Sequence, residues 1–218
     1  METWGHRSSV RGDGARRTRR AIVAAAGELF VRDGYQATSI AAVALAAGVD
    51  RSAVAAACGP KPALLRAVVD RALGGDDEPV PPADRPWFRP VWDASCPADV
   101  LDAYAGVCAL LGGRASGVLG VVHRAAGTDP EVAELRRALR ADRRDAASRV
   151  AAHAARTGRL RTGLDRATDV LWLLNDPAHY GALVHGRGWP EAAFREWLAG
   201  AMRASLLPAG RDGRPAGG

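Results

Sequence analysis

Hydrogen-bond donors gather in the first third of this 218-residue chain, and their types define the chemistry open to it. Arg51 and Ser52 open an alanine-rich stretch, and the only lysine, Lys61, follows shortly after. Further upstream, four arginines fall within five positions: Arg16, Arg17, Arg19 and Arg20. Guanidinium, ammonium and hydroxyl groups of this kind bind phosphate oxygens and the edges of bases. The pattern favours a nucleic-acid partner.

The distribution of charge indicates the same partner. The formal net charge is +6. Residues 1–73 contain eleven Lys or Arg and six Asp or Glu, whereas residues 74–218 contain nineteen and eighteen. A basic end on a balanced body is typical of a protein that meets a polyanion through that end. The alternative is a solvated basic tail with no partner.

Residues with the spacing of a catalytic or metal site are missing from the sequence. It has no G-x-S-x-G, no phosphate-binding loop, no G-x-G-x-x-G and no H-E-x-x-H. Cys58, Cys96 and Cys108 are odd in number and form no C-x-x-C pair, which argues against disulfides and zinc. We therefore expect no enzyme activity, no metal and no cofactor, and rank a small helical enzyme last among the interpretations.

No uncharged apolar run of about 18 residues is present, and residues 1–20 lack the apolar centre of a secretory signal. These two features predict a cytoplasmic protein with no membrane partner. The histidines, among them His153, His179 and His185, show no metal spacing. We expect them at the surface, in a pocket or at an interface.

Abundant alanine and helical periodicity predict an all-α fold. The expected helices cover residues 15–33, 39–46, 51–58, 60–73, 98–112, 116–126, 129–157, 165–186 with a break at Pro177, and 190–207. Gly112 and Gly113 are interpreted as a helix stop. The Gly- and Pro-rich segment 74–97 is predicted to be an irregular crossover.

Residues 38–58, TSIAAVALAAGVDRSAVAAAC, have the spacing of a helix-turn-helix. Ala44 is the small residue that two steeply crossing helices need, and Gly48 tolerates the positive φ of the turn. The valines at 43, 49 and 54 would pack the pair. Arg51 and Ser52 would lie at the N-terminal end of the second helix, where base edges are reached. An ordinary helical hairpin is the alternative, because an alanine-rich chain forms such hairpins readily.

The text RRAIVAAAGELFVRDGYQATSIAAVALAAGVD, followed by GPKPALL, resembles the N-terminal domain of the TetR family of repressors. The segment TGRLRTGLDRATDVLWLLNDPAHYGALVHGRGWPEAAFREWLAGAMRASLL resembles the C-terminal end of an actinobacterial branch of that family. The resemblance implies an N-terminal three-helix helix-turn-helix domain followed by a larger helical ligand-binding and dimerisation domain. It also implies a homodimer that binds double-stranded DNA at a palindromic operator and is released by a small-molecule effector.

The resemblance divides the chain into a flexible basic arm (1–15), a DNA-binding domain with a fourth helix (16–73), the crossover (74–97), a ligand-binding and dimerisation domain (98–207) and a disordered tail (208–218). The predicted DNA-binding residues are Arg17, Arg20, Thr38, Ser39, Arg51, Ser52 and Lys61. The predicted ligand-binding residues are Tyr104, Cys108, His123, Arg124 and Trp172. The predicted dimer-interface residues are Trp172, Tyr180, Phe194, Trp197, Leu198 and Ala201.

One departure from the family pattern affects the second helix of the motif. The family ends that helix with two aromatic residues, and this chain has Ala55 and Cys58 at the two positions. In the family, the first aromatic residue contacts phosphate and the second packs this helix onto the first. The alternative function is therefore a ligand-binding or scaffolding dimer with weakened or lost DNA binding.

Overall fold

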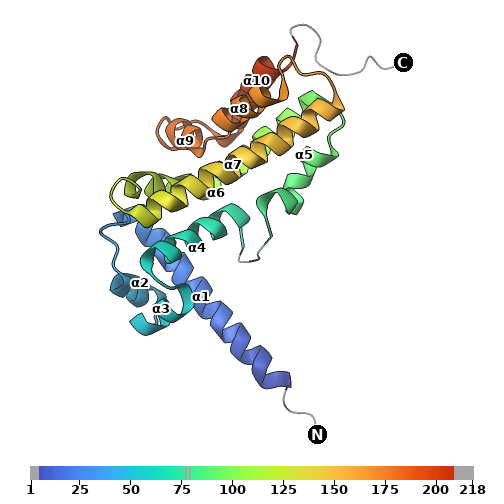
Figure 1. Cartoon of the computed structure of the whole chain (residues 1–218). Coiled ribbons are helices and arrows are strands. Elements are labelled where there is room, and N and C mark those ends of the chain that lie inside the picture. The colour runs from blue at the N-terminus through green and yellow to red at the C-terminus, as the bar shows by residue number, and fades with distance from the viewer. Residues whose placement is uncertain (1–4, 77, 79, 209–218) are drawn as a thin grey trace. The chain divides into compact units, whose positions relative to one another are not determined.

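The computed structural model describes residues 5–76, 78 and 80–208, with side chains described from Gly14 onwards. The described residues are helical or irregular and include no strand, as the sequence predicted. The chain divides into two compact units. The N-terminal unit comprises Met1–Asp77 and Gly117–Arg136, and the C-terminal unit comprises Glu78–Ser116 and Arg137–Gly218. The two longest helices after the first, α6 and α7, contribute residues to both units (Figure 1).

Four helices form the first part of the N-terminal unit: α1 (Gly5–Asp33), α2 (Ile40–Ala47), α3 (Arg51–Cys58) and α4 (Lys61–Gly74). The predicted apolar face of α1 is confirmed, because Ile22, Ala26, Leu29 and Phe30 are all buried. These four residues lie at spacings of four, three and one, which places them on one side of a helix. The N-terminal unit therefore packs around α1.

The start of α1 differs from the prediction. The helix begins at Gly5, so residues 5–14 continue it where the sequence predicted a flexible arm. No proline occurs before Asp33, and nothing in this stretch interrupts the i to i−4 hydrogen bonding of a helix. Residues 1–4 of the predicted arm and residues 209–218 of the tail predicted for 208–218 lie outside the described residues.

The remaining helices are α5 (Arg89–Asp93), α6 (Pro97–Ala125), α7 (Pro130–Thr157), α8 (Leu164–Leu174), α9 (Pro177–Tyr180) and α10 (Glu191–Leu206). A π-helical turn, Gly181–His185, follows α9. The core of the C-terminal unit is built from buried residues of α6, α7, α8 and α10, such as Leu101, Val150, Leu171 and Leu198. Removing a side chain of this size from water stabilises a fold by about 1.5–3 kcal/mol.

The predicted crossover, 74–97, is more regular than expected. It contains two 3₁₀ turns, Pro82–Asp84 and Pro86–Phe88, and then α5. Phe88 and Val91 are buried in the core of the C-terminal unit, and the indole N–H of Trp92 donates to the Ala83 carbonyl at 2.8 Å. Apolar contacts therefore order a segment whose prolines and glycines indicated a linker.

The helix stop predicted at Gly112 and Gly113 is wrong. Helix α6 runs unbroken through both glycines. The structure gives a packing reason for them: a Cβ at Gly112 would lie 2.5 Å from the ring of Tyr180, and one at Gly113 would lie 3.2 Å from its hydroxyl. The two glycines thus make room for an aromatic side chain from α9, and neighbouring hydrogen bonds keep the helix intact.

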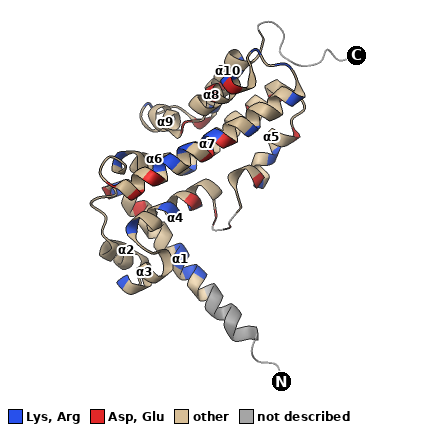
Figure 2. Ribbon diagram, in the orientation of Figure 1, with Lys and Arg blue, Asp and Glu red and all other residues tan. Residues whose placement is uncertain are grey.

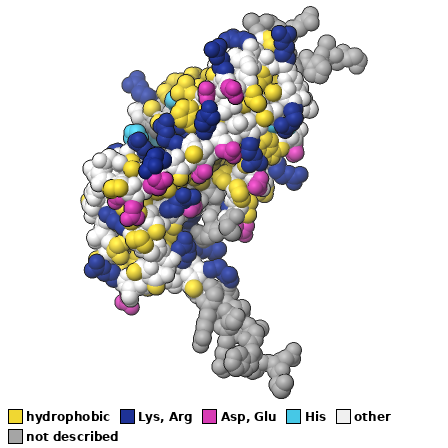
Figure 3. Space-filling model, in the orientation of Figure 1, with side chains coloured by type: hydrophobic (Ala, Val, Ile, Leu, Met, Phe, Trp, Pro, Cys, Tyr) yellow, Lys and Arg dark blue, Asp and Glu magenta, His cyan; other side chains and the backbone are white. Residues whose placement is uncertain are grey.

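Helix α6 is also long and apolar enough to cross a membrane on composition alone, with half of its most apolar window buried inside the protein. Buried residues such as Leu101, Tyr104, Val118 and Val122 occur along its length. Helix α7, in contrast, has Lys or Arg and Asp or Glu positions interspersed along its length (Figure 2), and charged side chains of both signs lie on this face of the molecule (Figure 3). These properties are those of a central core helix beside a solvated one.

Candidate nucleic-acid interface and ligand site

Helices α2 and α3 form a helix-turn-helix, bent by 99° at the turn. Gly48 adopts the left-handed conformation (φ +66°), and its N–H is directed at the Ala44 and Leu45 carbonyls at the end of α2. Val43, Ala44 and Val54 are buried where the two helices pack. The spacing argument made for Ala44 and Gly48 is therefore confirmed.

The outer face of α3 exposes one long polar side chain. Arg51 and Ser52 are its first two residues and are exposed, whereas Val54 and Cys58 face the core. Among the described residues, Arg51 has no hydrogen-bond or ion-pair partner. Asp50 occupies the N-cap position, but its side chain makes no capping hydrogen bond. An unpaired guanidinium at the start of such a helix is placed to hydrogen-bond with a base edge.

The two hydroxyls before α2 have different roles, although both were predicted to contact DNA. Ser39 is exposed and caps α2, its Oγ accepting from the Ala42 N–H at 3.0 Å. Thr38 is buried, and its hydroxyl lies 2.8 Å from the Gly34 carbonyl and 3.3 Å from that of Leu29. Thr38 therefore ties the loop to α1 and offers no group to a ligand at the surface.

The end of α3 is fastened to α1 by an arginine in place of an aromatic residue. Arg19 donates to the Ala57 carbonyl at 2.5 Å and to the Cys58 sulfur at 3.6 Å. Cations are stabilising at a helix C-terminus, where carbonyls lack partners and the helix dipole is negative. Cys58 itself fills a buried position, and burial raises the pKa of its thiol while Arg19 opposes the rise. Ala55, at the other altered position, is exposed.

Lys61, at the start of α4, is half-buried. Its ammonium lies 4.4 Å from the centre of the Tyr35 ring and 3.4 Å from the Gln36 carbonyl. Burial lowers the pKa of Lys61, and the charge of Asp129 partly offsets that fall. Lys61 is therefore held in place by the loop before α2, with part of its surface open to solvent.

The same loop is bonded to the turn between α6 and α7. The Tyr35 hydroxyl donates to Asp129 at 3.2 Å, and the Gln36 amide donates to the Thr128 hydroxyl at 3.0 Å. Asp129 also accepts from the backbone N–H groups of Glu131 and Val132 at the start of α7. Burial, with help from Asp129, raises the pKa of the Tyr35 phenol. This connection could not be predicted from the sequence, because the paired residues lie more than ninety positions apart.

Two further predicted DNA contacts, Arg17 and Arg20, lie one turn apart on α1 and are exposed. Positions of basic residues on α1 and at the start of α3 are blue in Figure 2. Arg71 of α4 donates to the Arg20 carbonyl at 3.1 Å, which fixes the backbone at this point. Seven predicted DNA-binding residues thus occur in the N-terminal unit, and six of them keep a side chain at least partly exposed.

The predicted ligand-binding residues are not gathered at one place. Tyr104, Cys108 and Trp172 belong to the C-terminal unit, whereas His123 and Arg124 belong to the N-terminal unit and are exposed. The physical reason is the unbroken α6: at about 1.5 Å per residue, position 123 lies roughly 22 Å along the helix from position 108. His123 and Arg124 therefore do not line a site with the other three.

Tyr104 lies in a polar cluster inside the C-terminal unit. The Asn175 amide donates to the Tyr104 hydroxyl at 2.7 Å and to the Arg143 carbonyl at 3.3 Å. Arg143 forms an ion pair with Asp176 at 2.8 Å, and its guanidinium lies 5.6 Å from the centre of the Trp172 ring. Asn175, Arg143 and Asp176 had no signal in the sequence beyond the break at Asn-Asp-Pro.

Burial dominates the chemistry of this cluster. It raises the pKa of the Cys108 thiol to about 12 and also raises that of the Tyr104 phenol. The Trp172 indole N–H and the Asn175 side-chain oxygen are buried without a hydrogen-bond partner among the described residues. Buried polar atoms are normally paired. The indole N–H is therefore available to donate to a bound molecule or water, and the Asn175 oxygen is available to accept from one.

Three of the six predicted interface residues are buried inside the protomer. Tyr180, Phe194 and Leu198 are buried, and Trp172 and Ala201 are partly buried. The Trp197 ring is 37% exposed. Three other large apolar side chains of this unit, which were not among the predicted contacts, are exposed to at least about the same degree as Trp197: Leu164, Leu173 and Trp189.

Comparisons with known proteins match both units. Residues 22–68 match the family described as bacterial regulatory proteins, tetR family, and residues 94–201 match the tetracyclin repressor-like, C-terminal domain. No curated protein sequence matches the chain significantly.

Several solved structures share the fold. NalD of Pseudomonas aeruginosa, the secondary repressor of the MexAB-OprM multidrug efflux pump, is 21% identical, with a TM-score of 0.65 over 89% of this chain and 99% of its own. A transcriptional regulator from Rhodococcus sp. is 17% identical (TM-score 0.59; 86% and 95% covered). A gamma-butyrolactone receptor is 19% identical (TM-score 0.56; 89% and 90% covered).

Proposed function

Since the chain belongs to the TetR family of transcriptional regulators, we propose that it is a cytoplasmic homodimeric repressor that leaves a palindromic operator when a small molecule binds its C-terminal unit. The single observation that carries this proposal is Arg51. It is exposed at the start of α3, with no described partner and with a surface of small side chains beside it. No side chain or backbone group in the described part of the chain pairs with this guanidinium, which leaves it for a base edge.

A dimer is needed because a palindrome presents two half-sites, about one helical turn or a multiple apart. The exposed apolar side chains of α8 and of the stretch from Trp189 to Trp197 supply the surface for it. Leu173 is 61% exposed, and Trp189 and Trp197 pack edge to face at 6.3 Å. Water-exposed leucine and tryptophan side chains of this size are typical of an interface between protein subunits.

Release by a ligand requires that the ligand prefer the form of the dimer that does not bind DNA. The pair Tyr35 and Asp129 supports a route for this preference. It joins the loop before α2 to the α6–α7 turn, and both helices extend into the C-terminal unit. A shift of α6 or α7 on ligand binding would therefore be transmitted to the helix-turn-helix through a hydrogen bond.

The second candidate is a ligand-binding or scaffolding dimer that no longer binds DNA. The observation that favours it is the loss of both aromatic side chains at Ala55 and Cys58. The bonds from Arg19 to the end of α3 argue for the first candidate, because they hold this helix in place without an aromatic residue.

Gel-shift assays with DNA from the protein's own promoter region distinguish the two candidates. The wild-type protein should bind one site specifically. Replacing Arg51 by alanine should weaken binding to that site by about 1–3 kcal/mol, roughly 5- to 150-fold, and weaken binding to random DNA far less. Arg32→Ala is the matched control, since Arg32 is an exposed arginine of the same unit that is already paired with Asp33 at 2.8 Å.

An unchanged ratio of specific to random binding in Arg51→Ala would show that α3 does not read the sequence. Absence of any specific site for the wild-type protein would favour the scaffolding dimer. The salt dependence gives a second measure, because each lost phosphate contact lowers the slope of log K against log salt by about one unit. Lys61→Ala should lower the slope in this way and weaken specific and random binding alike.

A further inference from the structure

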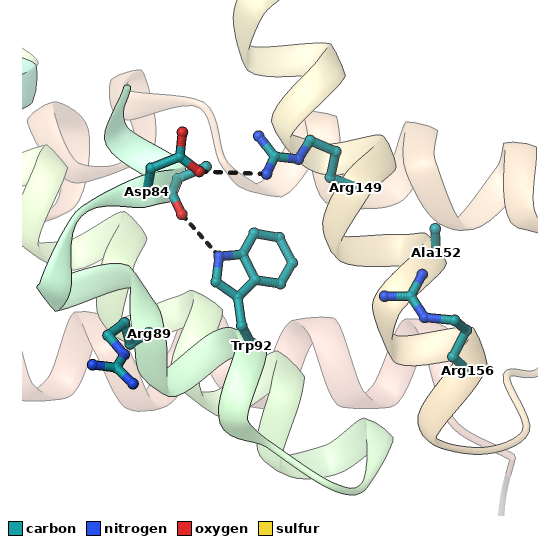
Figure 4. Close-up of a pocket in the computed structure, with 7 residues that line it drawn as sticks. Asp84, Arg89, Trp92, Arg149, Ala152 and Arg156 are labelled. Carbon is teal, nitrogen blue, oxygen red and sulfur yellow. Dashed lines mark hydrogen bonds and ion pairs between the residues drawn. The ribbon is translucent and has the colours of Figure 1, made fainter. Parts of the chain in front are cut away.

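An open pocket of about 620 Å³ lies in the C-terminal unit between α7 and the segment from Ala83 to Trp92. Figure 4 shows the side chains that line it. Arg149, Ala152 and Arg156 come from α7, where spacings of three and four residues place them on one face. Asp84 comes from a 3₁₀ turn, and Arg89 and Trp92 come from α5. The volume is that of a site for a small organic molecule.

The charge of the pocket is strongly positive. Its lining contains three guanidinium groups and one carboxylate. The carboxylate, Asp84, neutralises only part of one of them, because its nearest approach to Arg149 is 3.7 Å and both side chains are about half exposed. Exposed pairs of this kind contribute about 0–1 kcal/mol, so Arg149 can exchange this partner for a ligand at little cost. Arg89 has no described partner.

Arg156 is held in position by His153, one turn before it on α7. It donates to the Nδ1 atom of His153 at 3.2 Å. Because arginine can only donate, Nδ1 must accept, and the proton of the neutral ring is then on Nε2. That Nε2 atom is buried and has no hydrogen-bond partner among the described residues. The guanidinium of Arg156 is thus held by His153, while the buried Nε2–H of His153 has no partner among the described residues.

The opposite wall of the pocket is a rigid indole. Trp92 donates to the Ala83 carbonyl, stacks on Phe88 with ring centres 5.0 Å apart, and meets the His153 ring edge-on at 5.5 Å. The guanidinium of Arg149 lies 5.4 Å from the centre of the Trp92 ring and so stands beside the indole. Together with Ala83 and Ala152, it gives the pocket an apolar side. A molecule that fits must therefore combine a negative charge with an apolar body.

We propose that this pocket binds an organic carboxylate, with the carboxylate held by Arg149 and Arg156 and an apolar body beside Ala152 and the part of the Trp92 indole that Phe88 and Arg149 leave exposed. The planar fork of arginine matches the two oxygens of a carboxylate. This pocket is separate from the buried cluster around Tyr104, since the two share no residue. The inference rests on the proposed function only for its regulatory meaning, which is that the effector of the repressor is an anion.

Calorimetric titration of the full-length protein with benzoate and 1-naphthoate tests the proposal. The neutral amides, benzamide and 1-naphthamide, serve as matched probes that keep the ring and remove the charge. We expect 1-naphthoate to bind one per protomer and at least tenfold more tightly than 1-naphthamide. Arg149→Gln and Arg156→Gln should each weaken it about tenfold or more. Arg166→Gln, an exposed arginine of α8 outside the pocket, is the control and should not change it.

Arg156→Lys tests whether the effect of Arg156→Gln is merely structural, since lysine keeps the positive charge but lacks the planar guanidinium that can bind both carboxylate oxygens. It should bind 1-naphthoate more weakly than the wild type and more tightly than Arg156→Gln. Circular dichroism melting of each variant reports whether the fold is retained. Equal affinity for the carboxylates and amides, or binding unchanged in both glutamine variants, would overturn the proposal.

Gel shifts on the same preparations separate this proposal from the proposed function. If the protein binds its operator specifically but shows no arginine-dependent carboxylate binding, the carboxylate proposal is wrong and the proposed repressor function is unaffected. If it shows arginine-dependent carboxylate binding but binds no operator, the carboxylate proposal is supported and the proposed repressor function is wrong. Release of operator DNA by 1-naphthoate from the wild type, but not from Arg149→Gln, would support both.

Discussion

Replacing Gly112 by alanine should destabilise the protein, against the normal preference of helices. The new Cβ would lie 2.5 Å from two ring atoms of Tyr180 and 2.7 Å from its Cβ. This ring cannot move aside easily. It is 5% exposed, its hydroxyl donates to Glu191 at 2.9 Å, and it packs edge-on against Phe194 at 5.1 Å. Overpacking costs about 1–3 kcal/mol and occasionally more, whereas alanine gains only about 0.5–1 kcal/mol over glycine within a helix.

We therefore expect Gly112→Ala to lower the free energy of unfolding by about 1–2 kcal/mol, measured by urea denaturation at a fixed protein concentration. Gly113→Ala is the adjacent control. Its Cβ would approach the Tyr180 hydroxyl at 3.2 Å and the Glu191 carboxylate at 3.4 Å, at an exposed position, so only small shifts are needed and the change should cost less than Gly112→Ala.

A double-mutant cycle identifies the cause. In a Tyr180→Ala background, Gly112→Ala should cost less than it does in the wild type, because the two ring atoms at 2.5 Å are gone and only the Cβ contact remains. If Gly112→Ala were as stable as Gly113→Ala, or if its cost were the same in both backgrounds, the packing argument for this glycine pair would be refuted.

Three further predictions follow from burial and exposure. Thr38→Val should lose about 1 kcal/mol of stability, because a buried hydroxyl bonded to the Gly34 carbonyl is removed, while the operator affinity of the folded protein stays the same; a loss of affinity at unchanged melting temperature would make Thr38 a DNA contact after all. The pKa of Cys108 is raised to about 12 from an ordinary value near 9, so the folded state keeps its proton where the unfolded state loses it, and stability should fall as pH rises from about 9 toward 12, by at most about 1.4 kcal/mol per pH unit. Urea denaturation of Cys108→Ala should show a shallower fall, and an identical slope would contradict the reasoning. If α8 forms the proposed dimer interface, Leu173→Glu should be a 22.8 kDa monomer in light scattering, whereas Val31→Glu, an equally drastic change at an exposed position of the N-terminal unit, should be dimeric like the wild type; a dimeric Leu173→Glu would contradict the proposed interface.

The helix-turn-helix could be predicted from the sequence because its determinants are local. A small residue at Ala44, a left-handed residue at Gly48 and buried valines at fixed spacings specify two short helices and the turn between them. Each of these preferences acts within a few residues along the chain, so composition and spacing contain the information. The exposed position of Arg51 follows from the same periodicity.

The roles of individual side chains depended on how the helices and loops pack together. Thr38 was predicted to contact DNA, but its loop packs against α1, and its hydroxyl is buried within hydrogen-bond distance of the Leu29 and Gly34 carbonyls. Gly112 was interpreted as a helix stop, but Tyr180, which lies 68 positions later, occupies the space that a side chain there would need. The pocket lined by Arg149 and Trp92 forms where α7 lies beside α5, and neither segment alone has a sequence pattern that predicts it. Backbone preference is a property of neighbours in sequence, whereas burial is a property of neighbours in space, and only the packed helices decide which side chains remain free to bind.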